Sequence, residues 1–370
     1  METQRLPKKR VAMQDVADAA GVSRTTASFV LNRARNAEQI PHDTQDRVLR
    51  VARDLGYTPN RVARSLRAGK TGIIGVFVYG LSNPFFVQLL NEVERVVRLA
   101  GYDLLLGMPR DSTATGMPGH GANEGLTHDA TLSGWPVDGL MALWSYDTHV
   151  LREAISNGKG NSNGPVVYVG CPTPDIDGDM ASADIYSGAR LAFHHLHNER
   201  GYRRIALLGP DWIAEQSARY SKDRAQVEDR VRAYYDDCAA TGVRPEILVA
   251  DTSDEEMRRG ARDIGLALSH RAPKDRPRAV LCQNDMAAVG LISGLERGGL
   301  RVPEDVAVIG FDGTDEGQLL ARPLTTISVP VRDVCEAGID CMIARINGDN
   351  TRIEPRRVLF PCQLVVGETT

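Results

Sequence analysis

Long apolar runs, a signal peptide and clustered cysteines are all missing from this 370-residue chain. No apolar run reaches the ~18 residues that a membrane-spanning helix needs. The first residues are charged, but no apolar stretch follows them as it would in a secretory leader. The six cysteines show no CxxC spacing, which favours reduced, mostly buried thiols over a metal site. We therefore expect a cytoplasmic protein with no membrane contact.

The sequence also lacks the short motifs of several large enzyme classes. It contains no GxGxxG, P-loop or HExxH pattern. Its GxSxG match, GNSNG at 160–164, precedes a predicted strand instead of following one, so it lacks the strand–turn–helix setting of a nucleophilic serine. His194 and His195 are adjacent, but neither paired carboxylates nor metal-ligand spacing accompany them. We expect no enzymatic activity and no cofactor. An α/β enzyme stays open as the alternative, which a turnover assay would test.

Charge is unevenly distributed along the chain, although its formal net value is only −4. Residues 1–70 carry 14 Lys and Arg against 7 Asp and Glu, whereas residues 71–370 carry 30 against 41. A basic head on an acidic body is typical of a protein whose head meets nucleic acid. For Lys8, Lys9 and Arg10 alone, a solvated charge run is the simpler interpretation. The length and the 42% of hydrophobic residues predict several domains with a sizeable core.

Residues 11–56 have the pattern of three short helices. The first helix has apolar residues at i, i+3, i+4 and i+7, namely Met13, Val16, Ala17 and Ala20. Gly21 allows a tight turn, and Ser23 is a good N-cap for a second helix. A third amphipathic helix begins near Pro41 and ends at Gly56 as a left-handed cap. Two short helices joined by a turn that contains glycine predict a helix-turn-helix, whose second helix enters the major groove of DNA.

The rest of the chain alternates between strands and helices. The predicted strands are 72–78, 102–106, 139–143, 166–169, 205–208, 279–282 and 306–311. The predicted helices between them include 85–100, 187–200, 224–241 and 285–298. Such alternation indicates parallel sheets covered by helices on both faces. Residues 108–125 are rich in Gly, Pro, Ser and Thr, which favours an irregular loop.

Longer blocks make the chain resemble the lactose-repressor (LacI/GalR) family of transcriptional regulators. The blocks are DVADAAGVSRTTASFVLN (15–32), GYTPNRVARSL (56–66), LSNPFF (81–86), DIYSGARLAFHHL (184–196), GYRRIALLGP (201–210), QNDMAAVGLISGLERGGLRVPEDVAVIGFD (283–312) and PLTTISVPV (323–331). The likeness runs from residue 11 nearly to residue 370. It implies an α/β protein with a three-helix helix-turn-helix domain and a periplasmic-binding-protein-like core of two Rossmann-like subdomains.

The resemblance also implies domain boundaries. The helix-turn-helix domain would span residues 1–58, a hinge helix and linker 59–70, and the core 71–370. Because the chain crosses three times between subdomains in such folds, one subdomain would hold about 71–185 and 329–355. The other would hold about 186–323 and 356–370.

For DNA recognition, the resemblance places Arg24 and Thr25 on base edges at the start of the recognition helix. Thr26, Ser28 and Asn32 are better placed for phosphates. Phe29 stands where many relatives have Arg. Its ring could pack on a thymine methyl or against the neighbouring helix, and both interpretations stay open.

The hinge is the second predicted DNA element. Asn60 is placed to cap a short helix that contains Arg61, Ala63 and Leu66. A helix of about two turns is marginal in isolation, so we expect it to form when two copies pack together on DNA. The resemblance makes Leu66 a wedge between base steps in the minor groove, although a plain core leucine is the alternative.

The effector residues that the resemblance implies are Phe86, Asp184, Arg230, Asn284 and Asp312. Phe86 offers a stacking face, and the polar groups suit sugar hydroxyls. Each polar residue also has a purely structural interpretation. Asp312 could be a turn residue at a strand end, Asn284 a helix cap and Arg230 part of a surface ion pair.

Together these features predict a transcriptional regulator, most simply a repressor. It would bind a pseudo-palindromic operator in double-stranded DNA as a homodimer. A small-molecule effector, expected to be a sugar, would shift the equilibrium between two states by its differential affinity for them. A transport-associated sugar-binding protein is the other class considered, but it would need a signal peptide and would lack the basic head. The sequence leaves open the effector's identity, the direction of its effect, and a dimer against a tetramer.

Overall fold

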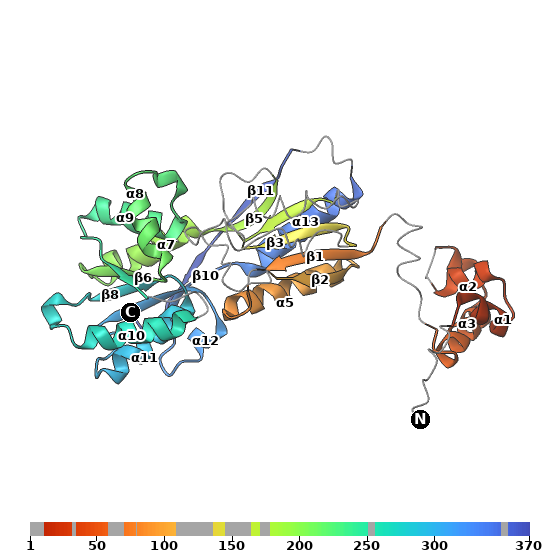
Figure 1. Cartoon of the computed structure of the whole chain (residues 1–370), viewed down its shortest axis with the longest axis horizontal. Helices are drawn as coiled ribbons and strands as arrows, with labels where there is room; N and C mark the ends of the chain where they lie inside the picture. Colours follow the sequence, from red (N-terminus) through yellow and green to blue (C-terminus); the bar gives the residue numbers. More distant parts are fainter. Residues whose placement is uncertain are drawn as a thin grey trace, which may run out of the picture. The chain divides into compact units, whose positions relative to one another are not determined.

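The computed structural model describes residues 11–31, 35–57, 70–78, 80–108, 136–144, 164–170, 178–250, 256–348 and 354–370. The chain divides into two compact units, Met1–Thr71 and Gly72–Thr370 (Figure 1).

The first unit is a small helical domain. Its helices are α1 (Met13–Ala20), α2 (Arg24–Leu31), the 3-10 helix η1 (Arg35–Gln39) and α3 (His42–Asp54). Gly21 and Gly56 end helices with positive φ angles of 65° and 66°, as only glycine does at no steric cost. The Ser23 hydroxyl accepts a hydrogen bond from the backbone N–H of Thr26 at 3.0 Å, which caps α2. Its core consists of Val16, Ala17, Ala20, Ala27, Val30, Val48 and Ala52.

The second unit contains two sheets. The first sheet has the strand order β11-β5-β4-β3-β1-β2, and all its neighbours are parallel. Its strands are β1 (Ile73–Val78), β2 (Asp103–Gly107), β3 (Gly139–Leu143), β4 (Val166–Val169), β5 (Asp179–Asp184) and β11 (Arg357–Pro361). Helices α5 (Pro84–Leu99) and α13 (Val331–Asn347) pack against this sheet and against each other.

The second sheet has the order β12-β10-β9-β8-β6-β7 and is parallel except where β12 meets β10. Its strands are β6 (Ile205–Gly209), β7 (Ile247–Val249), β8 (Ala279–Cys282), β9 (Ala307–Asp312), β10 (Thr325–Ser328) and β12 (Gln363–Val365). One face carries α7 (Ile185–His194), which continues as the π-helix η2 (His195–Glu199), with α8 (Trp212–Tyr220) and α9 (Asp229–Thr241). The other face carries α10 (Met257–Ser269) and α11 (Asp285–Arg297). Three shorter elements are η3 (Arg224–Gln226), η5 (Pro273–Asp275) and α12 (Asp315–Gln318).

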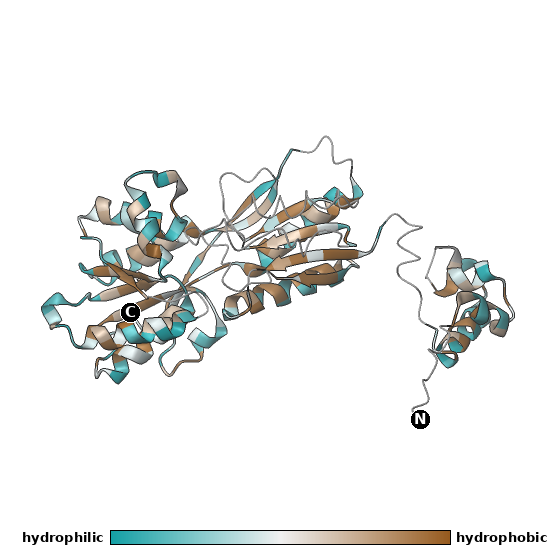
Figure 2. Cartoon of the chain, viewed as in Figure 1, coloured by the Kyte–Doolittle hydropathy of each residue, from teal (hydrophilic) through white to brown (hydrophobic). Residues whose placement is uncertain are grey.

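Hydropathy explains this layering. The central strands are apolar along their length, whereas the outer faces of the helices are polar (Figure 2). Strands β3, β6, β8 and β9 are buried at every residue, as expected where helices cover both faces of a parallel sheet. The sequence thus predicts the α/β fold correctly, because continuous apolar strands cannot stand exposed to water.

The chain passes between the two sheets three times. It leaves the first sheet at Asp184, returns after Ser328, and crosses again between β11 and β12. The boundary expected near residue 355 is therefore wrong, because β11 pairs with β5 in the first sheet. The physical reason is that β11 covers the edge of β5, which would otherwise leave unpaired backbone groups. The third crossing follows Pro361 instead.

One predicted helix is interrupted. The expected helix over 224–241 breaks after the single turn η3, because Val227 and Glu228 are extended with ψ near 138°. Helix α9 then begins at Asp229, with the Glu228 side chain as its N-cap. This break places Glu228 and Arg230 side by side at the start of α9.

Two further observations concern the described residues only. None of their helices combines the length and the apolarity needed to cross a membrane. Their five cysteines are buried and unpaired; they are Cys238, Cys282, Cys335, Cys341 and Cys362.

Candidate DNA-binding and effector sites

Helix α2 presents a polar amino-terminal turn. The Arg24 and Thr25 side chains are exposed there, whereas Thr26 is half-buried and its hydroxyl contacts that of Ser23 at 2.8 Å. Ser28 and Phe29 are half-buried on the next turn. Among the described residues, Phe29 is not part of the small apolar core of this unit. The other predicted DNA contacts, Asn32, Asn60, Arg61, Ala63 and Leu66, lie outside the described residues.

Three hydrogen bonds that sequence reasoning missed fix the position of α3 in this unit. The Arg47 Nε group donates to the carbonyl oxygen of Ala20 at 3.0 Å, across the end of α1. The Gln45 side-chain amide donates to the carbonyl oxygens of Ala37 and Ile40 at 2.9 and 2.8 Å. These bonds hold the segment between α2 and α3 against α3, and so stabilise the framework that presents Arg24.

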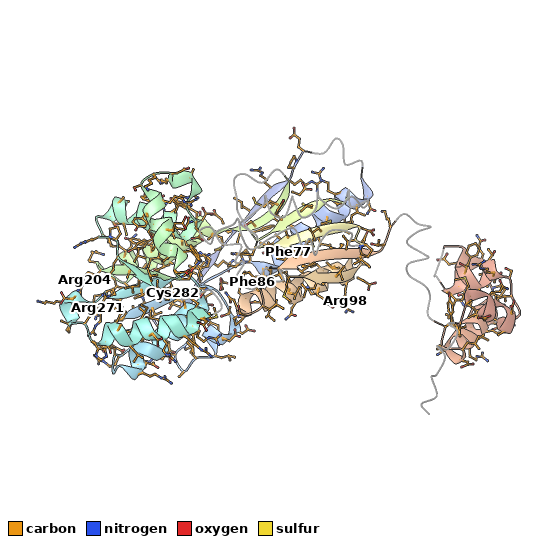
Figure 3. All side chains as sticks on the ribbon, viewed as in Figure 1. Phe77, Phe86, Arg98, Arg204, Arg271 and Cys282 are labelled. Atoms are coloured by element: carbon orange, nitrogen blue, oxygen red, sulfur yellow. The ribbon has the colours of Figure 1, made fainter. Side chains whose placement is uncertain are left out.

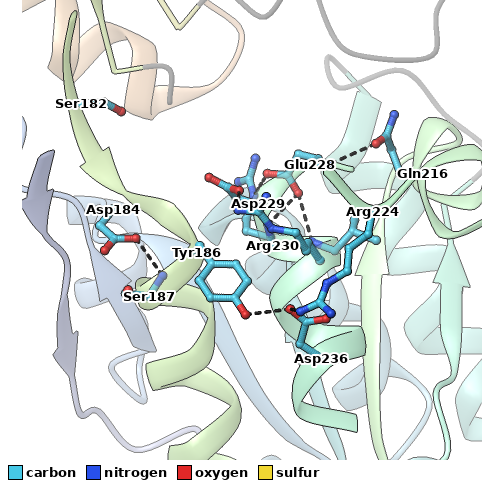
Figure 4. A network of polar contacts seen from close by, with 12 residues as sticks. Ser182, Asp184, Tyr186, Ser187, Gln216, Arg224, Glu228, Asp229, Arg230 and Asp236 are labelled. Atoms are coloured by element: carbon cyan, nitrogen blue, oxygen red, sulfur yellow. Dashed lines mark hydrogen bonds and ion pairs between the residues drawn. The ribbon is translucent and has the colours of Figure 1, made fainter. Parts of the chain in front are cut away.

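Arg230 is the best-anchored of the predicted effector residues. Its Nε donates to Glu228 Oε1 at 2.7 Å, and its Nη1 donates to the Gln283 carbonyl oxygen at 2.8 Å. The guanidinium also lies over the Phe311 ring, 5.4 Å from the ring centre. Arg230 is only 4% exposed, so the alternative of a surface ion pair is wrong. Figure 4 shows the Arg230–Glu228 pair at the start of α9.

Glu228 is the main residue that sequence reasoning missed. Its side chain is 1% exposed. It accepts hydrogen bonds from the backbone N–H groups of Arg230 and Val231 at 3.0 and 3.2 Å, and its own N–H donates to Gln216 Oε1 at 3.0 Å. The signal in the sequence is a glutamate two residues before an arginine at a helix start, a pattern far less typical of caps than Ser or Asp.

Two more predicted residues also cap helices at strand ends. Asp184 ends β5 and accepts the N–H of Ser187 at 2.9 Å, which caps α7. Asn284 follows β8 and accepts the N–H of Ala287 at 2.8 Å, which caps α11. The structural interpretation of Asn284 as a helix cap is therefore confirmed.

Asp312 and Trp144 both have a positive φ angle, which is rare for residues other than glycine. They are the non-glycine residues with positive φ in the described part of the chain, at 122° and 48°. Asp312 ends β9, and Trp144 directly follows β3. Such conformations cost free energy and cluster at functional positions. The expectation of a strand-end position for Asp312 is thus confirmed, and its backbone there is strained.

Phe86 lies on the first turn of α5. Its ring is edge-on to Phe85, with ring centres 5.8 Å apart, and Phe85 in turn is edge-on to Trp144 at 5.0 Å. Figure 3 shows Phe86 at the end of α5 nearer the second sheet and Arg98 at its far end. Phe86 is half-buried, so part of its ring is available for contact.

Several of the predicted effector residues lie close enough together for their charges to interact. Burial raises the pKa of the Cys362 thiol to about 12, and the charges of Asp184, Arg230 and Asp312 all act on it. Burial also raises the pKa of Asp229 to about 6, although the Arg232 guanidinium opposes this shift. The structure therefore gathers Asp184, Arg230 and Asp312 around the chain crossings, with Glu228 and Asp229 beside them.

A second polar network braces this region from α7, α8 and α9. The hydroxyls of Tyr186 and Tyr220 donate to the two carboxylate oxygens of Asp236 at 2.7 and 2.5 Å. Arg224 pairs with the same carboxylate, as Figure 4 shows in part. The shared Asp236 carboxylate links η3, which precedes α9, to α7 and α8. It thereby helps to hold the chain segment that leads to Glu228.

Comparison with known proteins identifies the family. Residues 12–60 match the model of bacterial regulatory proteins of the lacI family, and residues 193–370 match a periplasmic binding protein-like domain. The chain is 30% identical to the HTH-type transcriptional repressor PurR of Photobacterium profundum, over 91% of this chain and 92% of that one. It is 31% identical to the ribose operon repressor of Escherichia coli, over 90% and 92%. This chain belongs to the lacI family.

The fold agrees with that membership. The structure is similar to the lac repressor dimer bound to operator and the anti-inducer ONPF, with a TM-score of 0.73, 24% identity, and coverage of 98% of this chain and 99% of that one. The lacI-family chain described here is therefore a DNA-binding regulator of transcription, with a helix-turn-helix head and a two-sheet core. Its predicted family and fold class are both confirmed.

Proposed function

We propose that this protein represses transcription by binding a pseudo-palindromic operator as a homodimer, and that a sugar bound in the core controls that binding. The observation that supports the proposal is that one lacI-family chain contains both a candidate DNA-binding helix and a candidate ligand-binding cluster. An exposed polar helix start at Arg24 could read DNA, and a buried polar cluster around Arg230 could read a ligand.

On DNA, we assign Arg24 and Thr25 to base edges, because both side chains are exposed at the start of α2. Arginine can donate to guanine O6 and N7 together, which is worth about 1–3 kcal/mol of discrimination. Thr26 and Ser28 are assigned to phosphates, which supply affinity but no sequence information. Phe29, outside the apolar core, is assigned to a thymine methyl. Asn32 and the hinge residues Asn60, Arg61, Ala63 and Leu66 keep the roles that the sequence predicts.

In the core, we assign effector binding to Phe86, Asp184, Arg230, Asn284 and Asp312. Phe86, Asp184, Asn284 and Asp312 lie at or next to the carboxyl ends of strands or the starts of the helices that follow them, where open α/β sheets bind ligands. Arg230 lies at the start of α9 and donates to the Gln283 carbonyl oxygen next to the end of β8. A relative named the ribose operon repressor supports a sugar as the effector. We also propose the domain division of residues 1–58, 59–70 and 71–370, with the third crossing moved to follow Pro361.

For the homodimer, we propose that a second copy covers a groove beside α5 and α12. The groove has a volume of about 710 Å³ and is lined by both helices and by the start of α13. Leu319 next to α12 is 83% exposed, and Val87 on α5 is 41% exposed. Apolar side chains of this kind favour a protein partner. The similar lac repressor structure is a dimer bound to operator, which supports the same assembly here. As a regulator that binds the chromosome, the protein would act in the bacterial cytoplasm.

The test is a selection of bound sequences from a random duplex pool with the purified full-length chain, followed by binding titrations over a range of salt concentrations. We expect a two-fold symmetric site whose affinity falls steeply with salt, because basic residues displace counterions from phosphates. Adding D-ribose, cellobiose and other sugars should then change the affinity for that site. A chain that selects no symmetric sequence, with or without sugars, would contradict the proposal.

A further inference from the structure

The features of a protein that attract an anionic ligand are a guanidinium group and the amino-terminal end of a helix. Both are present where α9 begins, at Arg230. Both are also already occupied by the carboxylate of Glu228, which accepts from the Arg230 Nε and from two backbone N–H groups of the first turn. Glu228 thus stands where the carboxylate or phosphate of a charged ligand would bind.

The neighbouring helix starts are occupied in the same way. Asp184 caps α7 and Asn284 caps α11, each with its own side-chain oxygen. Around them lie further negative charges, since Glu228 and Asp184 both act on Asp229 and oppose its ionisation. An anionic ligand would therefore find few free N–H donors and several carboxylates.

We infer that Glu228 is a specificity-determining residue, which restricts the effector to sugars without a negative charge and rejects sugar acids and sugar phosphates. This inference rests on the proposed effector site. Glu228 acts by neutralising the charge of Arg230 while holding its side chain in place. The carboxylate is 1% exposed at its side chain, so solvent does little to screen its charge.

The test compares matched pairs of sugars by calorimetry on the full-length protein: D-ribose with D-ribose 5-phosphate, and D-glucose with D-glucuronate and D-glucose 6-phosphate. We expect any neutral sugar that binds to bind at least tenfold more tightly than its anionic partner. Glu228→Gln keeps an acceptor at the helix start but removes the charge, so this ratio should fall at least tenfold. A merely structural role would weaken both members of a pair equally.

Two further variants keep the experiment decisive. If Glu228→Gln does not fold, Asp229→Asn removes a nearby negative charge without touching the bonds of Arg230, and the ratio should fall in the same direction. Glu246→Gln is the matched control, because Glu246 pairs with Arg271 at a half-exposed position away from this cluster, and the ratio should not change.

The outcomes separate the two proposals. Tighter binding of an anionic member by the unmodified protein, or an unchanged ratio in a folded Glu228→Gln protein, would overturn the role of Glu228 and leave a sugar-controlled regulator intact. Failure of every sugar to bind or to alter operator affinity would overturn the proposed function, and the inference with it.

Discussion

Glu228 and Arg230 form a buried pair whose two members depend on each other. Their side chains are 1% and 4% exposed, and Arg230 spans from α9 to the end of β8 through the Gln283 carbonyl. A buried ion pair adds little net stability, because the cost of desolvating the two charges cancels most of their attraction. Removing one partner is costly, because the other charge is left buried and unpaired. The pair therefore holds Arg230, the arginine that we propose binds the effector, in a fixed position at a modest cost in stability.

A double-mutant cycle tests this dependence. Arg230→Met should cost about 3–5 kcal/mol of unfolding free energy, because Glu228 is left buried without its cation. The double variant Arg230→Met with Glu228→Gln should be more stable than the single variant. Urea unfolding of the unmodified protein, the two single variants and the double variant measures both effects. Simple additivity of the two losses would show that the residues do not act as a pair.

Sequence reasoning singles out Arg230 as a candidate effector residue but does not single out Glu228. Arginine at this place is part of a family pattern, whereas a glutamate in a charged stretch normally faces solvent. Only the break between η3 and α9 turns Glu228 inward. That break depends on tertiary partners such as Gln216, twelve residues away, which no local pattern reveals.

At the scale of elements, one buried ion pair joins an edge region of the first sheet to its covering helix. Arg345 on α13 donates from Nε and Nη2 to the Asp179 carboxylate on β5, at 2.6 and 2.8 Å. Burial alone would raise the pKa of Asp179, but hydrogen bonds from Arg345 and from the Arg356 N–H lower it below its usual value. Asp179 thus stabilises the fold in its ionised form.

The pH dependence follows from that sign. A carboxylate with a lowered folded pKa stabilises the protein above its unfolded pKa of about 3.9, and the contribution is lost as the pH falls through the folded value. Asp179→Asn should therefore cost about 3 kcal/mol at pH 7, and the gap to the unmodified protein should shrink below about pH 4. Denaturant unfolding at several pH values measures the gap. As a control, Asp263→Asn in an exposed pair should cost less than about 1 kcal/mol.

Helices α10 and α11 depend on close contact through glycine. A Cβ on Gly265 would lie 2.5 Å from the carbonyl oxygen of Leu291, and one on Gly294 would meet the Arg262 carbonyl oxygen closer still. Gly294→Ala should force the helices apart and cost about 1–3 kcal/mol despite its higher helix propensity. Gly80→Ala, which would meet no atom within 4 Å, is the control. Equal melting temperatures for both variants would contradict this account.

Strand prediction from the sequence is correct for continuous apolar runs, such as the four-residue strands β4 and β8, and misses β5 and β10, whose sequences DMASAD and TTIS are more polar. The buried strands β6, β8 and β9 were expected within a residue or two, because their apolar runs have no alternative place to go. The three-residue strands β7 and β12 were not predicted, and β11 was assigned to the wrong subdomain. Their pairing is decided by which sheet edge is open, a property of the assembled fold.

At the scale of the whole molecule, an operator with two-fold symmetry requires two copies of the chain. The proposed contact is the groove beside α5 and α12. Leu319→Asp should place a charge in that contact, and we expect dimerisation and operator affinity to weaken at least tenfold, because burying an unpaired charge is costly. Sedimentation and gel-shift titration measure the two effects.

The control for this experiment is Leu191→Asp. Leu191 is 42% exposed on α7, which covers the opposite face of the second sheet from α11. This variant should dimerise and bind DNA as the unmodified chain does. Loss of dimers in both variants, or in neither, would argue against the assigned face.

The buried thiol of Cys362 offers a built-in reporter of motion. It is 5% exposed and lies between β11 and β12, where the chain makes its third passage between the sheets. Its raised pKa keeps it protonated, and thiols react with alkylating agents only as thiolates. Its alkylation rate, followed by mass spectrometry, would thus report how often the segment between β11 and β12 opens to solvent. A ligand that stabilises the closed core should lower that rate.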